Sequence, residues 1–523
     1  MTIAITGSVL LASNRAPGPR EPAVPVPTTP STPTPAPSPT QIELAPRTLG
    51  EKLDALLAAP FLTYARAGIS VLDVTTGKVL YAHNPDLLLN PASNVKLVTS
   101  AAALALLGPE YRYSTRLYAE HDALRGHTVR GPLYLEGGGD PDLVTADLYE
   151  LASDLYARGV RTIDGGIVVD GNRFDRDELP PGYDQKDEMA GYRAPVGAAS
   201  VNFNTYVVNI RPGRNIGELV AVNIDPPIRS MSVRCRAKTG VGYRNRLMVS
   251  VEQEDERTQI NLDGVLGVDS GPVSYRYPVS DPSRNTAEVL SLVLRQRGIR
   301  LNHTGLARGR VPERAELLAV HRSPALSVLV RAINKLSNNF MAESVLKSLA
   351  PNDQPGTFAR ALERIHAFLD EIGLSKTGLV IGNGSGLYNT NRISATQMTY
   401  LLRHVYRDFR YSADFLASLA IMGADGTIRS RLRGSPVQRY VRAKTGTLDD
   451  VSCLSGYAGA VGGTPVAFSF MFNGIDRLDA QRARELQNQM AEVIAIDAAG
   501  VPLPPALPVT PQPGDELETI APE

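Results

Sequence analysis

The spacing of apolar positions predicts a helix-and-sheet domain that is interrupted by a β-rich region. Residues 69–74 form one apolar run and residues 76–82 continue it after a Thr76-Gly77 turn, which predicts a β-hairpin. Residues 93–107 are apolar on nearly every side and end at Gly108-Pro109. A helix without a polar face belongs in the centre of a domain.

The pattern changes between about Tyr113 and Val279, where short β-rich runs alternate with Gly and Asp turns. Long helical patterns return at residues 283–297, 324–349 and 357–372. The middle of the chain is therefore predicted to be a β-rich insertion inside a domain of mixed α/β type.

A chain of 523 residues is too long for one ordinary core, so more than one domain is expected. Residues 2–12 resemble the apolar part of a secretory signal without its preceding positive charges, which indicates a truncated export signal. Proline-rich segments cannot bury a core and form extended spacers or tails. The predicted organisation is a signal at 1–15, a Pro-rich linker at 16–46, catalytic domain at 47–112, inserted β-rich domains at 113–282, catalytic domain at 283–499 and a disordered tail at 500–523.

Composition excludes several classes of function. Lys plus Arg and Asp plus Glu number 54 each, so no basic excess exists to neutralise a nucleic-acid backbone. No stretch reaches the ~18 to 20 apolar residues that a transmembrane span requires. Cys235 and Cys453 are far apart and form no C-x-x-C pair, so we expect two separate thiols rather than a zinc site or a disulfide framework. No pattern in the chain sets its oligomeric state.

Ser93 and Lys96 stand one helical turn apart at the start of the apolar helix. A serine nucleophile needs an adjacent base, and the seven His residues serve no G-x-S-x-G elbow and form no H-E-x-x-H pair. Positions i and i+3 share a helix face, so Lys96 can reach Ser93 Oγ, and burial depresses a lysine pKa. We predict a serine acyl-enzyme hydrolase with Lys96 as the base and no metal or cofactor.

Two further motifs follow in a fixed order, and both have decoys. Ser337-Asn-Asn339 comes next, and Lys444-Thr-Gly446 lies in a strand-like run. Ser-x-x-Lys recurs at Ser344–Lys347, and Lys-Thr-Gly recurs at 238–240 and 376–378. Each motif alone is weak, but Ser-x-x-Lys, Ser-x-Asn and Lys-Thr-Gly in that order are the elements of the penicilloyl serine transferases. We therefore expect the decoys to be structural.

On these motifs the chain resembles the D-alanyl-D-alanine carboxypeptidase/endopeptidase family, the class C low-molecular-mass penicillin-binding proteins, over most of residues 49–498. The resemblance implies a penicillin-binding transpeptidase-like catalytic domain, an antiparallel sheet flanked by helices, with a large insertion of one or two domains. The family-like stretches are residues 91–97, 137–141, 334–339, 384–387, 426–432, 443–448 and 454–457.

The resemblance also implies the roles of individual residues. Ser93 would attack the carbonyl of the penultimate D-alanine, Lys96 would take its proton, and Ser337 would relay a proton to the leaving amine. Substrate binding would fall to Asn339, Lys444, Thr445, Gly446 and Thr447, with the backbone N–H groups of Ser93 and Thr447 holding the oxyanion. The expected partners are peptidoglycan peptides and β-lactam antibiotics, and the expected location is the periplasm or cell envelope.

One stretch departs from the family pattern. Asn383 replaces the usual Asp before Gly-Ser-Gly-Leu, and Tyr388 follows where a small polar residue is common. If Ser385 and its neighbours shape a subsite, peptide preference would differ from that of other members.

Two alternative functions remain at this stage. One is a different Ser-x-x-Lys hydrolase, either a β-lactamase or an esterase, and the other is a weakly catalytic wall-binding protein. The balance between carboxypeptidase and endopeptidase activity is also left open.

Overall fold

The computed structural model describes residues 48–254, 256–374, 378–459 and 462–500. The predicted signal, Pro-rich linker and, apart from Gly500, C-terminal tail lie outside these residues. Within the described ranges, no helix combines the length and the apolar character that crossing a membrane would need.

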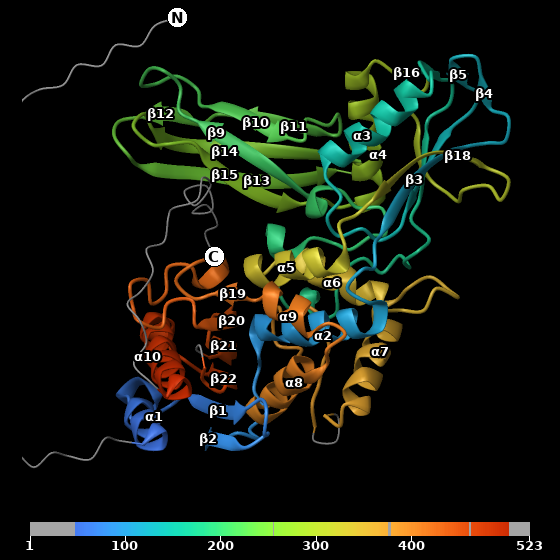
Figure 1. Ribbon diagram of the computed structural model, residues 1–523. Helices are drawn as coiled ribbons and strands as arrows, with labels where there is room; N and C mark the ends of the chain where they lie inside the picture. The colour runs from blue at the N-terminus through green and yellow to red at the C-terminus, as the bar shows by residue number, and fades with distance from the viewer. Residues whose placement is uncertain (1–47, 255, 375–377, 460–461, 501–523) are drawn as a thin grey trace, which may run out of the picture. The chain divides into compact units, whose positions relative to one another are not determined.

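The central sheet of the catalytic part has six antiparallel strands. Residues from both ends of the chain build it, so the two catalytic segments predicted from the sequence share one sheet (Figure 1). In spatial order the strands are β19 (Ala420–Ile421), β20 (Val441–Leu448), β21 (Val451–Ala458), β22 (Val466–Asn473), β1 (Arg66–Asp73) and β2 (Val79–His83).

Helices cover both faces of this sheet. On one face, α1 (Leu49–Leu57) and α10 (Ala480–Ala499) share a core with the strands (Figure 1). The other face is covered by a layer of α2 (Val95–Leu107), α5 (Leu326–Leu336), α6 (Asn339–Ser348), α7 (Phe358–Glu371), α8 (Ala395–Arg407) and α9 (Ser412–Ser418). Because both faces are covered, β21 and β22 are buried at every position.

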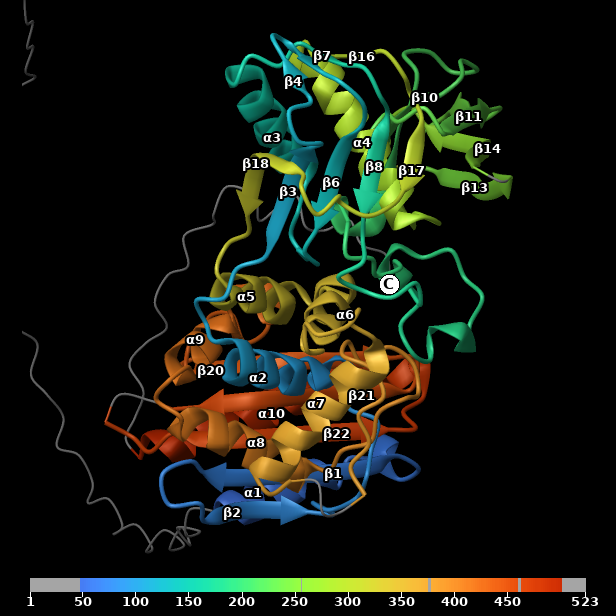
Figure 2. The same cartoon turned by 90° about the vertical axis from the view of Figure 1, so that its right-hand side faces the viewer.

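The inserted region contains two more sheets and two helices that pack together. A five-stranded sheet has the order β17 (Leu306–Arg308), β8 (Ile167–Asp170), β6 (Leu133–Gly137), β3 (Ser114–Ala119) and β18 (Glu316–Arg322). A smaller sheet has the order β16 (Arg300–Leu301), β7 (Thr162–Ile163), β5 (Thr128–Val129) and β4 (Leu124–Arg125). The helices α3 (Thr145–Ala157) and α4 (Pro282–Arg297) lie beside the five-stranded sheet of β17, β8, β6, β3 and β18 (Figure 2).

A pair of sheets with its own core completes the inserted region. One sheet has the order β10 (Ala221–Asp225), β9 (Thr205–Arg211) and β15 (Val273–Pro278). The other contains β11 (Met231–Cys235), β14 (Arg257–Gly267), β12 (Lys238–Gly240) and β13 (Asn245–Glu254). Apolar residues such as Tyr206, Ile260 and Leu266 are buried between the two sheets.

The end of the insertion differs from the predicted boundary at residue 282. The boundary predicted from the sequence places α4 in the catalytic domain, yet its buried residues Leu290, Val293 and Leu294 share a core with β3, β6 and α3. The segment that packs with the inserted sheets therefore continues through β18, and the catalytic part resumes at α5. An amphipathic helical pattern shows that a helix buries one face, but not which sheet it covers.

Other predictions from the pattern agree with the structure. The hairpin of residues 69–82 forms as β1 and β2 in antiparallel pairing. The long helical pattern at 324–349 divides into α5 and α6 at Ser337, whose backbone is left-handed (φ +60°). Cys235 and Cys453 are both free thiols, as expected.

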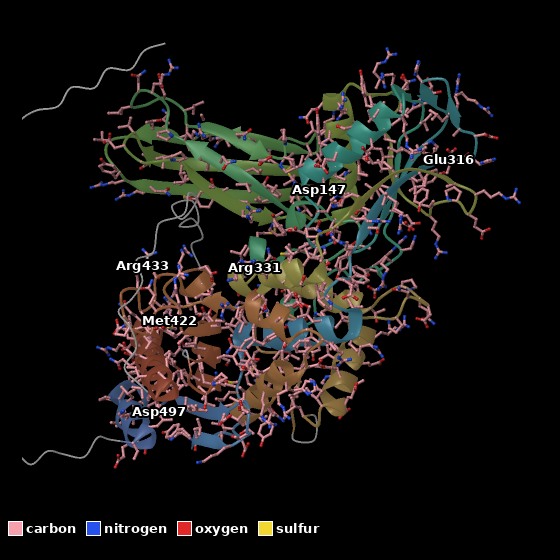
Figure 3. All side chains as sticks on the ribbon, in the orientation of Figure 1. Asp147, Glu316, Arg331, Met422, Arg433 and Asp497 are labelled. Carbon is pink, nitrogen blue, oxygen red and sulfur yellow. The ribbon has the colours of Figure 1, made fainter. Side chains whose placement is uncertain are left out.

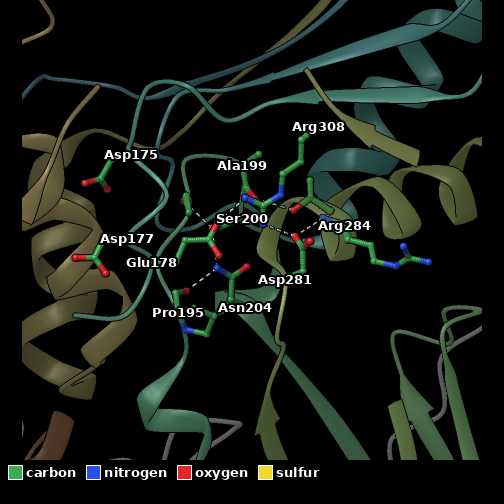
Figure 4. A network of polar contacts seen from close by, with 12 residues as sticks. Asp175, Asp177, Glu178, Pro195, Ala199, Ser200, Asn204, Asp281, Arg284 and Arg308 are labelled. Atoms are coloured by element: carbon green, nitrogen blue, oxygen red, sulfur yellow. Dashed lines mark hydrogen bonds and ion pairs between the residues drawn. The ribbon is translucent and has the colours of Figure 1, made fainter. Parts of the chain in front are cut away.

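A polar network joins separate segments of the inserted region (Figure 4). Arg308 donates to Glu178 at 3.2 Å and to Asp281 at 2.7 Å, linking β17 to the segment before α4. Asn204 Nδ2 donates to the carbonyl of Pro195 at 2.7 Å and to Ser200 Oγ at 2.8 Å. These contacts fix the segment around residues 178–204, part of which reaches the site described next.

Candidate active site

Ser93 lies in a short 3₁₀ turn, Ala92–Asn94, that leads directly into α2. The Asn90 side chain holds this turn, because its Oδ1 accepts from the Ala92 N–H at 2.9 Å. The Asn90 N–H in turn donates to Asn473 Oδ1 at 2.7 Å, which ties the turn to the end of β22. Ser93 is half-buried and stands at the N-terminal end of an otherwise buried helix.

A glycine-containing loop lies against this turn. A Cβ on Gly386 would lie 1.9 Å from the Ala92 carbonyl oxygen, and the φ of Gly386 is +82°. Only glycine allows both that approach and that backbone conformation. The loop thereby brings the carbonyl of Ser385 to Lys96.

Lys96 is completely buried, and its amine is surrounded by three oxygen atoms. Its Nζ lies 2.9 Å from Ser93 Oγ, 2.7 Å from Asn339 Oδ1 and 2.6 Å from the Ser385 carbonyl oxygen. Burial is the main cause that lowers the pKa of Lys96 well below its ordinary value, and the nearby cation Lys444 lowers it further.

Three oxygen atoms match the three N–H groups of a charged amine, which would then donate to Ser93, Asn339 and Ser385. A neutral lysine has two N–H groups and one lone pair, whereas the Asn339 amide oxygen and the Ser385 carbonyl can only accept hydrogen bonds. When Lys96 is neutral, its two N–H groups can donate to these two acceptors, which leaves the lone pair for the Ser93 hydroxyl. The arrangement can therefore accept the hydroxyl proton of Ser93.

Ser337 and Asn339 come from the junction between α5 and α6. Ser337 is the C-cap of α5, and its left-handed backbone lets the chain turn directly into the next helix. Asn338 caps α6, since its side chain accepts from the Met341 N–H. Asn339 Nδ2 donates to the Tyr192 carbonyl at 3.1 Å, so this side chain is held between Lys96 and the inserted region.

The strand β20 supplies Lys444, Thr445, Gly446 and Thr447. Lys444 is completely buried, and burial lowers its pKa to about 7. Its Nζ donates to Ser337 Oγ at 2.8 Å and to the Thr445 carbonyl at 2.9 Å. Thr445 Oγ1 donates to Thr427 Oγ1 at 3.0 Å, and Thr447 is exposed.

Gly446 determines how closely β20 approaches the turn that carries Ser93. A Cβ at this position would lie 2.5 Å from the Pro91 carbonyl oxygen and 3.2 Å from the Ala92 Cβ. Glycine is required here because the strand passes directly beside the turn that carries Ser93. The three sequence motifs thus meet in one place.

The decoy motifs lie elsewhere or make structural contacts. Lys347 pairs with Asp175 at 2.6 Å, and Ser344 Oγ donates to the Gly139 carbonyl at 3.1 Å. Lys238 is exposed and begins β12, so this Lys-Thr-Gly forms a strand of the inserted region. The third copy starts in residues 375–377, which lie outside the described ranges.

Glu343 is a buried acid at this site that the sequence analysis missed. It accepts from the backbone N–H groups of Gly384 at 3.1 Å and Ser385 at 2.7 Å, so it supports the loop whose carbonyl contacts Lys96. Burial raises the pKa of Glu343, and its charge favours the protonated form of Lys96. Glu343 stands four residues after Asn339 on the same helix face, and this spacing could have indicated from the sequence that Glu343 lies at the site.

A second missed feature is a segment of the inserted region that reaches the same loop. The buried Tyr183 hydroxyl lies 2.9 Å from Ser385 Oγ, and Tyr388 donates to Glu188 at 2.5 Å. Lys186 pairs with Asp449 at 2.9 Å, at the turn after β20. Nothing in the sequence pattern places residues 183–192 beside a loop about 200 positions later.

Asn383, the departure noted above, organises its own loop. Its Nδ2 donates to the carbonyls of Pro181 and Leu387 and to Thr390 Oγ1. Its Oδ1 accepts from the N–H of Gly386 at 2.9 Å. An amide both donates and accepts, and this position uses both properties, so Asn383 contributes to loop structure.

Among the residues that the structure describes, one group of side chains could hold a metal ion. The ligand atoms of Asp147, Glu150 and His321 lie within 4.8 Å of one another. They belong to α3 and β18 of the inserted region, where Figure 3 labels Asp147. The elements that carry Ser93, Lys96, Ser337 and Lys444 contribute no residue to this group.

Comparison with known proteins gives consistent matches. The D-Ala-D-Ala carboxypeptidase 3 (S13) family matches residues 49–496. A D-alanyl-D-alanine carboxypeptidase of Actinomadura sp. (strain R39) is 34% identical over 82% of this chain and 81% of its own length. The D-alanyl-D-alanine carboxypeptidase DacB of Haemophilus influenzae is 26% identical over 80% of this chain and 87% of its own.

Solved structures match as well. The crystal structure of penicillin binding protein 4 from Haemophilus influenzae has a TM-score of 0.72 and 24% identity. The match covers 85% of this chain and 98% of that one. The same protein complexed with a β-lactam matches with a TM-score of 0.68 at 23% identity, over 86% of this chain and 99% of that one.

Proposed function

The chain belongs to the D-Ala-D-Ala carboxypeptidase 3 (S13) family, and from this premise we propose that it is a DD-peptidase that cleaves peptidoglycan stem peptides through an acyl-enzyme on Ser93. The observation that carries this assignment is the position of the buried Lys96 amine, whose Nζ lies 2.9 Å from Ser93 Oγ. A buried lysine with a depressed pKa in that position is a competent base.

The proposed reaction has two stages, acylation of Ser93 and hydrolysis of the resulting ester. Ser93 Oγ attacks the carbonyl carbon of the penultimate D-alanine while its proton passes to Lys96. The backbone N–H groups of Ser93 and Thr447 hold the oxyanion of the tetrahedral intermediate. The intermediate collapses by breaking the C–N bond, and the proton taken up by Lys96 passes through Ser337 to the leaving amine, which restores neutral Lys96. Water then hydrolyses the ester and regenerates Ser93.

Lys444 binds the terminal carboxylate of the substrate. Its pKa of about 7 means that the resting amine is only partly charged near neutral pH. A carboxylate arriving nearby favours the charged form, so binding takes up a proton and gains a charge-assisted contact. Thr445 and Thr447 add hydroxyl donors on the same strand, and Asn339 holds the amide of the scissile bond.

Three consequences follow for ligands and location. A β-lactam presents a strained amide at the position of the D-alanyl-D-alanine bond and acylates Ser93. Cross-linked peptides carry a D-alanyl amide of the same type, so endopeptidase cleavage uses the same residues as carboxypeptidase cleavage. The substrate lies in the cell wall, so the protein acts after export, in the periplasm or cell envelope.

Covalent labelling tests the nucleophile. Fluorescent penicillin should label the wild-type protein and fail to label Ser93→Ala, while Ser344→Ala keeps normal labelling as the matched control. Label that persists on folded Ser93→Ala would overturn the assignment.

A turnover assay tests the reaction class. The protein should release D-alanine from a pentapeptide ending in D-alanyl-D-alanine, and a cross-linked dimer should be cleaved at the D-alanyl bond. Lys444→Ala should lower the acylation rate by several orders of magnitude, whereas the exposed Lys238→Ala should stay within about threefold. Esters cleaved in place of both peptides would identify another Ser-x-x-Lys hydrolase.

A further inference from the structure

The Lys-Thr-Gly motif that the active site does not use, Lys238–Gly240, belongs to a strongly basic segment. Residues 236–246 contain four cations, Arg236, Lys238, Arg244 and Arg246, and no acidic residue. All four cations are exposed. Among the described residues, no ion pair shorter than 4 Å engages any of them. The strand β12 and the start of β13 carry this segment at the end of the two sheets that is far from α3 and α4 (Figure 1).

The same end exposes large apolar side chains. Tyr243 is 81% exposed and Val241 is 74% exposed, in the loop between β12 and β13. Ile216 and Leu219 are 60% and 57% exposed. Their loop lies beside β12, since the Gly217 N–H donates to the Thr239 carbonyl at 2.8 Å and Leu219 pairs with Lys238. We call residues 236–246 together with Ile216 and Leu219 the basic tip.

These apolar side chains are additional to the core that holds the sheets together. The inner face of the sheets already buries Ile260, Leu262 and Leu266. The loop of Val241 and Tyr243 projects into open space, because a Cβ on Gly242 would have no atom within 4 Å. Exposed apolar groups at a projecting loop have a hydration cost that only a binding partner removes.

Cations and apolar groups also alternate across the outer face of the sheet. Val265 on β14 is paired with Lys238 on one side and with Arg246 on the other. Carboxylates also lie close to the tip, and the exposed Asp269 donates its backbone N–H to the Gly242 carbonyl at 3.2 Å. Glu218 accepts from the backbone and side chain of Asn215, and Asp263 accepts from the Gly264 N–H. The tip is therefore cationic with apolar groups at its centre.

We propose that the basic tip docks onto an anionic phospholipid bilayer. Arg and Lys reach the headgroup phosphates, while the aliphatic stems and Val241, Ile216 and Leu219 enter the headgroup boundary. Tyr243 has an apolar ring and a polar hydroxyl, the combination that is enriched at membrane interfaces. A soluble polyanion would interact with the cations alone and would leave the exposed apolar groups in water.

Vesicle binding of the full chain tests the proposal. We expect sedimentation with phosphatidylcholine vesicles that contain about one third phosphatidylglycerol, and at least about tenfold weaker sedimentation with phosphatidylcholine alone. Binding should weaken as salt rises, because exposed charges are screened. No difference between the two vesicle types would overturn the proposal.

Two variants and a charge-matched control separate the contributions. The triple variant Lys238→Gln, Arg244→Gln, Arg246→Gln should lose about tenfold or more in vesicle binding. The control Arg314→Gln, Arg364→Gln, Arg433→Gln removes the same charge from exposed positions elsewhere, Arg433 being labelled in Figure 3, and should bind as wild type. Equal losses in the two triples would mean that net charge alone acts, against the proposal.

The apolar part is tested by Val241→Ser, Tyr243→Ser, which should also lower vesicle binding. Unchanged binding in this variant, or competition by a soluble polyanion that displaces the protein completely, would assign the tip to an anionic polymer and overturn the bilayer proposal. Acylation by fluorescent penicillin should stay at the wild-type rate in all variants. That readout shows that each variant is folded, and it does not depend on where the protein docks.

Discussion

Lys96 and Lys444 are two buried lysines of the same site, and their amines have different surroundings. Lys96 Nζ contacts three oxygen atoms and has a pKa well below its ordinary value, whereas Lys444 has a pKa of about 7. Burial causes both shifts, and the proximity of the two cations adds to the shift at Lys96. A proton acceptor and a carboxylate-binding cation can therefore coexist near neutral pH.

Lys96→Arg tests the proton acceptor. Arginine keeps the positive charge but cannot release its proton, so acylation should fall to nearly zero. Wild-type acylation should rise with pH along a limb whose pKa lies well below the ~10.4 of a free lysine. Acylation rates with a β-lactam from about pH 5 to 10 measure both effects. Substantial activity in Lys96→Arg, with no such limb, would show that Lys96 acts only as a fixed cation.

Glu343→Gln tests whether the negative charge of Glu343 raises the pKa of Lys96. The glutamine carbonyl oxygen can still accept from Gly384 or Ser385, but the negative charge that favours protonated Lys96 is lost. The pKa of Lys96 should fall, so the rising limb of acylation should move to lower pH. A purely structural role would lower the rate at every pH without moving the limb. The pH profile distinguishes these outcomes.

At the scale of elements, the junction of α5 and α6 positions two site residues through an unusual backbone. Ser337 adopts φ +60° and ψ 30°, which non-glycine residues seldom do, and Asn338 then caps the next helix. The turn directs the Ser337 hydroxyl to Lys444 and the Asn339 amide to Lys96. Two adjacent helices thus supply groups to both lysines.

Ser337→Gly separates the effect of the left-handed backbone on stability from the effect of the hydroxyl group on turnover. Glycine adopts the left-handed conformation without strain, so the free energy of unfolding should change by no more than about 1 kcal/mol. Loss of the proton relay should lower turnover by about 10²- to 10⁴-fold. Denaturant unfolding and D-alanine release measure the two quantities on one variant. Turnover close to wild type would remove Ser337 from the proton pathway.

At the scale of the whole molecule, burying Lys96 and Lys444 costs stability. The pKa of Lys444 is about 7 in the folded protein and ~10.4 in the unfolded chain, so between these values the unfolded chain binds more protons. The free energy of unfolding should therefore rise as pH increases from about 7 toward 10, and Lys96 contributes with the same sign.

Lys444→Met tests this cost. The variant should be more stable than wild type at pH 7, on the order of 3 kcal/mol, and the advantage should shrink as pH rises to about 9. Unfolding of both proteins at several pH values measures the difference. Lys238→Met, at an exposed site, should show no such pH-dependent difference. A constant difference across the range would contradict the linkage.

The inserted region also bears on the site at this scale. Tyr183 and Tyr192 reach Ser385 and Asn339, which are the groups that surround Lys96. The contacts of Lys96 therefore depend on a segment that begins far away in the sequence.

The sequence by itself determined the order of the three motifs, the hairpin and the presence of a β-rich insertion, and it suggested Ser93 and Lys96 as the nucleophile and base that we propose. These features are local, because a helical turn sets the spacing of Ser93 and Lys96, and the period of apolar positions distinguishes helices from strands. The predicted family and fold class are confirmed by the comparisons. The identical Lys-Thr-Gly copies could be ranked only through their order relative to the other motifs.

Only the tertiary structure decided which distant segments meet. It placed α4 with the inserted sheets, Glu343 behind the Ser385 loop, and Tyr183 against that loop. It also separated Lys444, completely buried beside Ser337, from Lys238, exposed at a projecting end. Burial and long-range contacts arise from packing the whole chain, and burial of this kind is what lowers the pKa of Lys444.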